Sequence, residues 1–341
     1  MSECPYCFSQ SYEPHHPRCP LSGHASEIPI TGLVNGSTLD RGRYRVGTAL
    51  GQGGFGITYL CKDQRNACRV VVKEFFPKKF SNRKASGKNE VVFNGINELS
   101  MQRLWKQFRM EYELTAKAAQ PGVPKVYGFF SENNTAYIAM EFVAGMTFEK
   151  YLRKKNRLLP WWELRNKFYV PLLKIVGGLH RKKILHRDIS MVNVMITPDE
   201  RVFLLDFGAG RDFSKPDVIE KMYFANKKYA PIEQTKPQKG LPQGPWTDIY
   251  ALGTVFYVAV TGHYPPMALE RPRLAVESAL TYVPSLPEPF DNALMKSLYY
   301  YPQHRFQNVG DFWAALDEAP DPPIPTAGMN NWKKIIKRTS R

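Results

Sequence analysis

Two aspartates and one asparagine in the middle of the chain are the residues best suited to chemistry. Asp188 and Asn193 lie in a polar loop between two apolar runs, and Asp206 follows another apolar run thirteen residues after Asn193. Their carboxylate and amide oxygens are ligands that a hard cation such as Mg²⁺ prefers. A carboxylate that binds no metal can accept a proton instead. Because an aspartate can also simply cap a turn, the order and spacing of the three residues carry the argument.

A glycine cluster, Gly51, Gly53 and Gly56, stands between two β-prone runs. The same G-x-G-x-x-G spacing occurs in dinucleotide-binding turns, but such a turn opens into a helix. Here the β-prone residues 57–61 follow, so we expect a hairpin whose backbone amides can cover phosphate groups. A chance cluster of glycines is the alternative.

Lys73 ends a run of valines, where a buried lysine needs a charged partner. The helix-forming stretch 99–119 offers Glu111 and Glu113, which face different directions because they are two positions apart. Glu111 follows Phe108 by three residues. We therefore predict that Glu111 turns inward and pairs with Lys73.

The elements that must position these groups change in type along the chain. Short β-rich runs prevail first, and longer helical segments such as 162–180 and 247–261 prevail afterwards. This order predicts an α+β chain of two lobes. The predicted divisions are a Cys/His segment at 1–24, a linker at 25–43, a first lobe with its hinge at 44–143, a second lobe at 144–318 and a proline-rich basic tail at 319–341.

Together these motifs resemble those of eukaryotic-like serine/threonine protein kinases, in the style of bacterial members, over about residues 44–318. Three later matches strengthen the resemblance: Glu233 at the close of the activation segment, Asp248 in its supporting helix, and Arg305 as the partner of Glu233. The resemblance implies a bilobal protein kinase fold with a β-rich N-lobe and a helical C-lobe.

The resemblance also implies roles for individual residues. Asp188 is implied as the catalytic base, Lys73 as the contact to the ATP phosphates, and Glu111 as the partner of that lysine. Asn193 and Asp206 are implied as ligands of Mg²⁺ (or Mn²⁺). The residues implied to bind ATP are Gly51, Gln52, Gly53, Gly54, Phe55, Gly56, Thr58, Val71, Lys73, Met140, Glu141 and Val143.

Two positions depart from the kinase pattern. Ser190 stands where the catalytic loop usually has a lysine beside the γ-phosphate, and Asn226 stands where the substrate-facing loop usually has a threonine. We expect Asn226 to donate a hydrogen bond to Asp188 and to accept one from Ser190. Activity is then retained but slowed, because one positive charge is missing from the transfer site.

Three of the five cysteines lie in the first 19 residues, where Cys4 and Cys7 form a C-x-x-C pair. A tetrahedral zinc site needs four donors, and Cys19 with either His16 or His24 completes such a set. A segment this short and poor in aliphatic residues cannot form a core of its own, which favours a metal over a loose, reduced tail. We therefore predict a zinc-ribbon-like knuckle in this segment.

The basic charge of the chain is unevenly distributed. The net charge is +16, from 47 Lys plus Arg against 31 Asp plus Glu, and much of the excess lies in residues 74–110 and 321–341. Such charge suits nucleic acid, an anionic membrane or a solvated surface, and a solvated surface is the usual outcome. In the tail, the run 332–338 fits a helix on a membrane surface or an exposed terminus. We rank nucleic acid last among the partners.

Location is predicted from what the sequence lacks. No apolar run reaches the ~18 residues that span a bilayer, and the N-terminus has neither the basic nor the apolar region of a secretory signal. Cys61 and Cys68 lie in apolar runs and are predicted to be core residues. We therefore predict a cytoplasmic protein without a transmembrane segment, with delivery into another cell as the alternative.

The leading hypothesis is an active kinase that transfers the γ-phosphate of ATP to Ser/Thr hydroxyls of protein substrates. The alternative is a pseudokinase scaffold that binds ATP and recruits partners through the zinc knuckle and the basic tail. The retained Lys73, Asp188 and Asp206 argue against the scaffold, whereas Ser190 argues for it. A small-molecule phosphotransferase ranks third, because it usually lacks a full glycine-rich loop.

Overall fold

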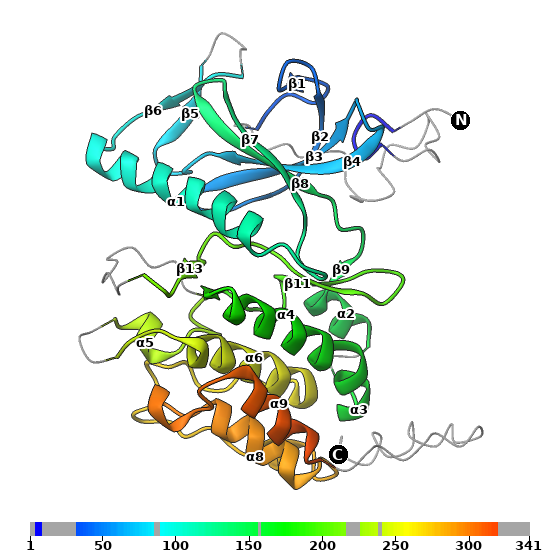
Figure 1. Ribbon diagram of the computed structural model, residues 1–341, viewed down its shortest axis with the longest axis vertical. Helices are drawn as coiled ribbons and strands as arrows, with labels where there is room; N and C mark the ends of the chain where they lie inside the picture. Colours follow the sequence, from blue (N-terminus) through cyan, green and yellow to red (C-terminus); the bar gives the residue numbers. More distant parts are fainter. Residues whose placement is uncertain are drawn as a thin grey trace.

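The computed structural model describes residues 4–8, 32–84, 89–155, 158–215, 226–237 and 241–319. The described part has two lobes, a β-rich N-lobe with one long helix and a helical C-lobe (Figure 1). The predicted bilobal fold is therefore confirmed. The chain passes from strands to helices after β8 (Thr135–Glu141).

The N-lobe is built on a six-stranded antiparallel sheet with the order β1-β2-β3-β4-β8-β7. Side chains alternate between its faces, so Val70 and Val72 of β4 are buried together on one face and Lys73 points to the other. The remaining strands are β1 (Thr38–Leu39), β2 (Tyr44–Gln52), β3 (Gly56–Asp63), β4 (Cys68–Phe75) and β7 (Val126–Glu132).

Helix α1 (Glu98–Lys117) packs on the face of the sheet that bears Lys73 (Figure 1). Asn97 caps its start, because Asn97 Oδ1 accepts a hydrogen bond from Ser100 N at 2.9 Å. Buried residues recur along the helix at spacings of three and four, and they include Leu104 and Phe108. This stripe fixes which side of α1 faces the sheet.

A two-stranded ribbon separates β4 from α1. Strand β5 (Ser81–Arg83) pairs with β6 (Val91–Phe93) in antiparallel register. Val91 N donates to Asn133 O at 2.8 Å in the turn between β7 and β8, so the ribbon is attached to the main sheet.

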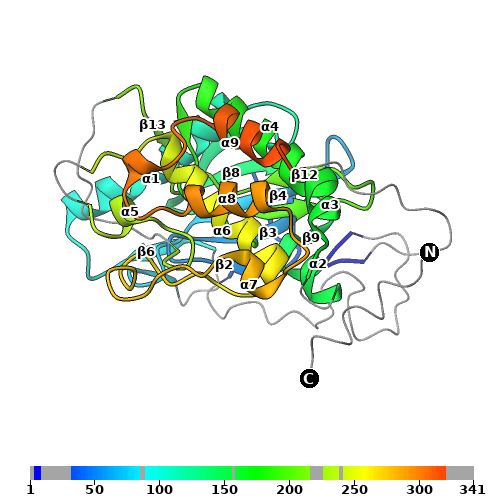
Figure 2. The same ribbon diagram turned by 90° about the horizontal axis from the view of Figure 1, so that it is seen from below.

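The C-lobe is organised around α6 (Pro245–Thr261), whose residues from Thr247 to Thr261 are all buried. A helix that is buried all round belongs in the centre of a domain. Seen from below, α6 and α8 lie in front of the strands of the N-lobe (Figure 2). The other helical elements are α2 (Phe148–Lys154), α3 (Trp161–Leu164), the π-helical turn η1 (Arg165–Tyr169), α4 (Val170–Arg181), α5 (Ile232–Thr235), α7 (Ala279–Tyr282), α8 (Glu288–Ser297), the 3₁₀ turn η2 (Pro302–His304) and α9 (Val309–Asp317).

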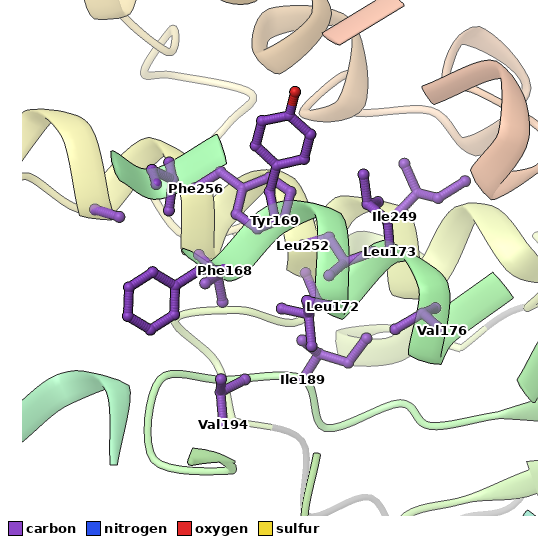
Figure 3. Close-up of a cluster of buried hydrophobic side chains, with 14 of the residues drawn as sticks. Phe168, Tyr169, Leu172, Leu173, Val176, Ile189, Val194, Ile249, Leu252 and Phe256 are labelled. Atoms are coloured by element: carbon purple, nitrogen blue, oxygen red, sulfur yellow. The ribbon is translucent and has the colours of Figure 1, made fainter. Parts of the chain in front are cut away.

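The apolar core of the C-lobe reaches the loop that carries the candidate residues. Leu172 from α4 and Leu252 from α6 are buried in the same cluster as Ile189, which lies within the polar loop, and Val194, which follows it (Figure 3). The loop is therefore fixed by burial at its middle and at its C-terminal end.

Short strands border the two polar loops of the C-lobe. The loop 186–193 lies between β10 and β11, and the loop 205–210 lies between β12 and β13. The strands are β9 (Met146–Thr147), β10 (Ile184–Leu185), β11 (Val194–Ile196), β12 (Val202–Leu204) and β13 (Arg211–Asp212). Strand pairing of β11 with β12 and of β10 with β13 brings the two loops side by side.

The start of the described chain packs on the N-lobe sheet. Cys4 and Cys7 are fully buried in one turn, closed by a hydrogen bond from Phe8 N to Cys4 O at 2.9 Å. Thr48 N of β2 donates to Tyr6 O at 2.9 Å, which docks the turn on the sheet. The other predicted zinc ligands, at 16, 19 and 24, lie outside the described residues. Within the described ranges no group of three or more potential metal-ligating side chains is present.

Two sequence expectations differ from the structure. Cys61 is buried as predicted, but Cys68 is exposed, because it opens β4 directly after the turn from β3. Leu33 and Leu39, within the expected linker, are buried against the sheet, so the described part of that stretch belongs to the N-lobe. Among the described helices, none is long and apolar enough to cross a membrane. The tail from residue 320 onward lies outside the described residues.

Candidate active site

Lys73 joins the two lobes through its ammonium group. Lys73 Nζ lies 2.6 Å from Glu111 Oε1 and 3.2 Å from Asp206 Oδ1. Strand alternation in β4 aims Lys73 at the cleft, and Glu111 belongs to the buried stripe of α1. Glu113 instead pairs with Arg109 on the surface at 3.2 Å. The structure thus brings Lys73 together with Glu111, as predicted from the helical spacing.

The surroundings of Lys73 favour its charged form. Burial acts to lower its pKa, but the carboxylates of Asp206 and Glu111 outweigh burial and hold the pKa of Lys73 above its usual value. Lys73 is therefore a cation that lines the cleft.

Asp206 is held in a left-handed backbone conformation, with φ of 62°. Its Oδ1 accepts a hydrogen bond from Gly208 N at 3.0 Å. A Cβ on Gly208 would lie 3.0 Å from that oxygen and 3.2 Å from Glu111 Oε2, so the site favours glycine there. The positive charge of Lys73 lowers the pKa of Asp206, and its carboxylate is consequently ionised.

Asp188 and Asn193 are joined within the loop 186–193. Asn193 Nδ2 donates to Asp188 Oδ2 and to Asp188 O, each at 2.8 Å. Burial, helped by the negative charge of Asp206, raises the pKa of Asp188 to about 7. A carboxylate with such a pKa is a suitable proton acceptor near neutral pH.

The backbone of this loop is fixed by Asp248 of α6. The two carboxylate oxygens of Asp248 accept hydrogen bonds from His186 N at 3.0 Å and Arg187 N at 2.8 Å. His180 Nε2 lies 2.8 Å from Asp248 Oδ2. Arg187 has φ of 64°, a conformation that costs free energy unless neighbours hold it. Asp248 supplies that support, and His180 is a contributor that the sequence motifs did not reveal.

The glycine cluster forms the predicted hairpin between β2 and β3. Gly53 N donates to Gly56 O at 2.9 Å, which closes the tip. A Cβ on Gly56 would lie only 2.4 Å from Glu74 O of the next strand, so this position requires glycine.

A cavity of about 280 Å³ lies beneath the hairpin. The predicted residues that line it are Gly53, Gly54, Phe55, Gly56, Thr58, Lys73, Glu111, Asp188 and Asp206. The lining residues that sequence reasoning missed or assigned no contact are Leu104, Gln107, Phe108, Arg187, Gly208, Ala209 and Gln234. Gln107 Nε2 donates to Gly208 O at 3.2 Å, a contact between α1 and the loop 205–210 that no motif encodes.

The remaining predicted residues lie outside this lining. Gly51 and Gln52 end β2, Val71 pairs with Met140 across β4 and β8, and Val143 follows that strand. Glu141 is held at the lobe connection, where Glu141 N donates to Lys125 O at 2.8 Å. Asn193 reaches the site through its contact with Asp188.

The oxygen donors of the cleft fit a divalent cation. Asp206 is ionised and half exposed. Asn193 uses its Nδ2 to donate to Asp188, so its amide oxygen is the remaining acceptor. Mg²⁺ usually takes one or two protein oxygens and completes its shell with water and phosphate oxygens.

The two departures from the kinase pattern are not joined to each other. Ser190 Oγ is buried and has no hydrogen-bond partner among the residues that the structure describes. Asn226 Oδ1 instead accepts from Lys228 N at 3.4 Å, within its own turn. The expected hydrogen bond from Ser190 to Asn226 is therefore wrong for this structure, because Asn226 bonds locally, as asparagine often does in turns.

Glu233 and Arg305 form the ion pair that the sequence motifs indicated. Arg305 Nη1 lies 2.7 Å from Glu233 Oε1, and Arg305 Nη2 lies 3.1 Å from Glu233 Oε2. Both side chains are fully buried. This bidentate pair anchors α5 to the loop before α9.

Comparisons with known proteins agree with this arrangement. The family profile described as protein kinase domain matches residues 44–284. Serine/threonine-protein kinase PrkC of Bacillus subtilis is 25% identical over 288 residues, which are 82% of this chain and 41% of that protein. Serine/threonine-protein kinase PknA of Nostoc sp. is 28% identical over 289 residues, which are 80% of this chain and 47% of that protein. This chain thus spans less than half the length of these two curated relatives.

Among solved structures, the PpkA-294 apo form aligns with a TM-score of 0.69 at 26% identity. The alignment covers 84% of this chain and 99% of that chain.

Proposed function

This chain belongs to the protein kinase domain family, and on that premise we propose that it transfers the γ-phosphate of ATP to Ser/Thr hydroxyls of protein substrates. One observation carries the proposal: Lys73, held at 2.6 Å from Glu111 Oε1 and 3.2 Å from Asp206 Oδ1, lines the same cavity as Asp188. A paired lysine and a metal-binding aspartate are both required for phosphoryl transfer in this family.

In the proposed mechanism this chain positions groups and neutralises charge. Lys73 holds the phosphates, and Asn193 and Asp206 hold the divalent cation, Mg²⁺ or Mn²⁺, which neutralises phosphate charge when bound. Asp188 orients the incoming hydroxyl and accepts its proton, a role supported by its pKa of about 7. No covalent intermediate with the protein is needed.

Loss of the catalytic-loop lysine affects the rate in this proposal. Ser190 contributes no charge, so transition-state stabilisation at the γ-phosphate would rest on Lys73 and the bound cation. A pseudokinase that binds ATP and recruits partners is the second candidate, favoured by Ser190, whose buried Oγ has no hydrogen-bond partner within the described ranges.

Transfer of labelled phosphate tests the proposal directly. The full chain is incubated with ATP and Mg²⁺, alone and with casein and myelin basic protein, beside the variants Asp206→Asn and Ser190→Lys. Label on wild type that Asp206→Asn loses, recovered as phosphoserine or phosphothreonine, supports the kinase. Binding of ATP without label in wild type favours the pseudokinase. Recovery only in Ser190→Lys identifies the missing lysine as the cause.

We also propose a structural zinc ion in the N-terminal segment. Cys4 and Cys7 are buried on one turn that docks on β2, which supports a shared centre for their two sulfurs. Metal analysis of the full chain should find about one zinc per chain, with Cys19 and either His16 or His24 as the other ligands. The variants Cys7→Ser and Cys19→Ser should each lose it. Equal zinc content in wild type and both variants contradicts the proposal.

Contact of the basic tail with a membrane surface and a cytoplasmic location stay predictions from the sequence. The substrates and partners of the whole protein are proposals too, and ATP and a Ser/Thr-containing protein are the ones that the site supports. Nucleic acid is the least favoured partner, and its binding would have to fall steeply with added salt.

A further inference from the structure

The segment between β4 and α1 reaches back to the tip of the glycine hairpin. Phe76 N donates a hydrogen bond to Phe55 O at 2.9 Å, and Lys78 N donates one to Gly54 O at 3.1 Å. Both acceptor residues line the cavity. These two hydrogen bonds extend the pairing of β3 with β4 beyond Gly56. They connect the hairpin tip to Phe76 and Lys78, which do not line the cavity.

Aromatic packing reinforces this attachment. Phe55 of the hairpin and Phe80 and Phe93 of the segment all pack against one buried cluster. That cluster includes Phe75 of β4 and Phe108 of α1, and the ring centroids of Phe75 and Phe93 are 5.9 Å apart. The hairpin tip and the segment are therefore seated on the same apolar surface.

The segment is anchored on the opposite face of the sheet by a buried ion pair. Arg83 Nη2 lies 2.6 Å from Glu74 Oε2, and the Glu74 side chain has no solvent exposure. Arg83 Nη1 also donates to Asn89 O at 2.5 Å, which joins the two arms of the ribbon. Glu74 follows Lys73 directly, so neighbouring residues of β4 serve the cavity on one face and the segment on the other.

Two tyrosines complete the coordination of Glu74. Tyr59 OH donates to Glu74 Oε2 at 2.9 Å, and Tyr137 OH donates to Glu74 Oε1 at 3.0 Å. A buried carboxylate with three donors is satisfied, and a satisfied buried charge can fix one arrangement of chain segments.

The second arm of the ribbon is held independently. Asn134 Nδ2 donates to Val91 O at 2.9 Å, and Asn94 N donates to Phe80 O at 2.8 Å. The segment is thus held at the turn between β7 and β8, at Glu74 and at the hairpin tip.

We propose that residues 76–84 and 89–94 form a clasp that holds the glycine hairpin over the phosphate cavity, with Phe80 and Arg83 as positioning residues. The inference deepens the proposed kinase function and rests on it. The clasp acts on how long nucleotide stays bound and leaves the chemical step unchanged.

The physical reason is conformational entropy. A hairpin tip with three glycines has many accessible conformations, and ordering it on binding costs free energy. The two backbone hydrogen bonds and the seating of Phe55 restrict the tip before nucleotide arrives. A restricted tip binds phosphates more tightly, and the gain is expected mainly in a slower dissociation rate.

The test compares two ways of loosening the clasp with a matched control. Phe80→Ala removes one aromatic ring and leaves no charge unpaired. The double variant Glu74→Gln with Arg83→Met removes the ion pair without leaving a buried charge. The control Lys84→Gln breaks the exposed pair of Lys84 with Glu90, 2.8 Å apart on the same ribbon.

Dissociation of a fluorescent ADP analogue with Mg²⁺ is measured by stopped flow, together with single-turnover phosphoryl transfer. We expect both loosened variants to release the analogue at least about fivefold faster, with a matching rise in KM for ATP. The single-turnover rate should stay within about twofold of wild type, and Phe80→Tyr should restore slow release. Lys84→Gln should behave as wild type.

Hydrogen exchange makes the test independent of the kinase proposal. Amides of residues 53–56 should exchange faster in both loosened variants, even if wild type transfers no phosphate or binds no nucleotide. Unchanged exchange and unchanged release in Phe80→Ala overturn the clasp, whether or not the double variant folds. If exchange and release are unchanged in Phe80→Ala but wild type transfers phosphate, the clasp is wrong and the kinase proposal holds. If exchange is faster in the loosened variants but wild type transfers no phosphate, the clasp holds and the kinase proposal is wrong.

Discussion

The molecule has two buried ion pairs with similar chemistry and different surroundings. One is formed by Lys73 and Glu111, the other by Arg305 and Glu233. Lys73 and Glu111 meet at the cavity, where the Lys73 side chain is 16% exposed and its ammonium also contacts Asp206. Arg305 and Glu233 meet in the C-lobe, where neither side chain has any exposure. The first pair borders a site that must admit a ligand, and the second lies where no ligand can reach.

The two pairs differ in how completely their hydrogen bonds are satisfied within the chain. Arg305 also donates to the backbone oxygens of Tyr299 and Tyr300, each at 2.7 Å, and Glu233 accepts from Thr247 Oγ1 at 3.0 Å. At Lys73, two carboxylates share one ammonium, and that leaves net negative charge for a cation. In this molecule the saturated pair of Arg305 with Glu233 holds the fold, whereas the unsaturated pair of Lys73 with Glu111 leaves room for a ligand.

The largest expected effect is a loss of stability when the pair of Arg305 and Glu233 is broken. Glu233→Gln should lower the free energy of unfolding by about 3–5 kcal/mol, because it leaves the buried Arg305 without its counter-charge. Denaturant unfolding measures the loss. The double variant Glu233→Met with Arg305→Met should recover much of it. If Glu233→Gln loses less than about 1 kcal/mol of unfolding free energy, the Arg305–Glu233 pair does not hold the fold more strongly than the Lys73–Glu111 pair.

The next largest expected effect is a loss of activity when the pair of Lys73 and Glu111 is broken. Glu111→Gln should lower kcat/KM by about 10²-fold, because Lys73 is no longer held towards the phosphates. Its free energy of unfolding should change by less than about 1 kcal/mol, because Asp206 still balances the charge of Lys73. Parallel assays of activity and unfolding check both halves. A variant that is destabilised as much as Glu233→Gln contradicts the distinction.

A pH profile sharpens the assignment of the base. Asp188 must be ionised to accept a proton, and its pKa is raised to about 7 by burial and by Asp206. Activity should therefore fall as pH drops through 7, by about tenfold per pH unit well below it. The profile of kcat/KM between pH 5.5 and 8.5 is the measurement, with circular dichroism to check that the protein stays folded. If kcat/KM does not change between pH 6 and pH 8, Asp188 with a pKa of about 7 is not the group that accepts the proton.

The smallest effect is expected two residues from Glu111. Glu113 pairs with Arg109 at the surface, with both side chains more than half exposed. Glu113→Gln should change the unfolding free energy by less than about 0.5 kcal/mol, as exposed helical pairs do. Its kcat/KM should match wild type, which makes it the control for Glu111→Gln. A drop in activity near that of Glu111→Gln would show that helix α1 is sensitive to any charge change.

Local sequence pattern was sufficient where side-chain direction follows from spacing. Strand alternation aims Lys73 at the cleft, and the helical stripe turns Glu111 inward. The antiparallel pairing of short strands brings together the two polar loops that carry Asp188 and Asp206, whose order and spacing predicted a shared site. In each case the information lies within a few residues of the functional group.

The family resemblance implied the distant pair of Glu233 with Arg305, but other contacts between distant segments had no signal in the sequence. Gln107 reaches Gly208, and Arg83 reaches Glu74, through packing that no spacing encodes. The hydrogen bond expected between Ser190 and Asn226 failed for the opposite reason, since Asn226 bonds within its own turn. Cys68 was misplaced because an apolar neighbourhood in the sequence does not locate the end of a strand.

The support that Asp248 gives to the loop 186–193 has a consequence for synthesis of the chain. His186 and Asp248 are 62 positions apart, and Arg187 holds its left-handed backbone with the help of a carboxylate at the start of α6. During translation every candidate catalytic residue emerges before α6 does, and domains fold as the chain lengthens. A growing chain that ends before residue 245 therefore carries all of these residues without the support that orders them. The loop 186–193 can therefore take its ordered backbone only after α6 has been synthesised.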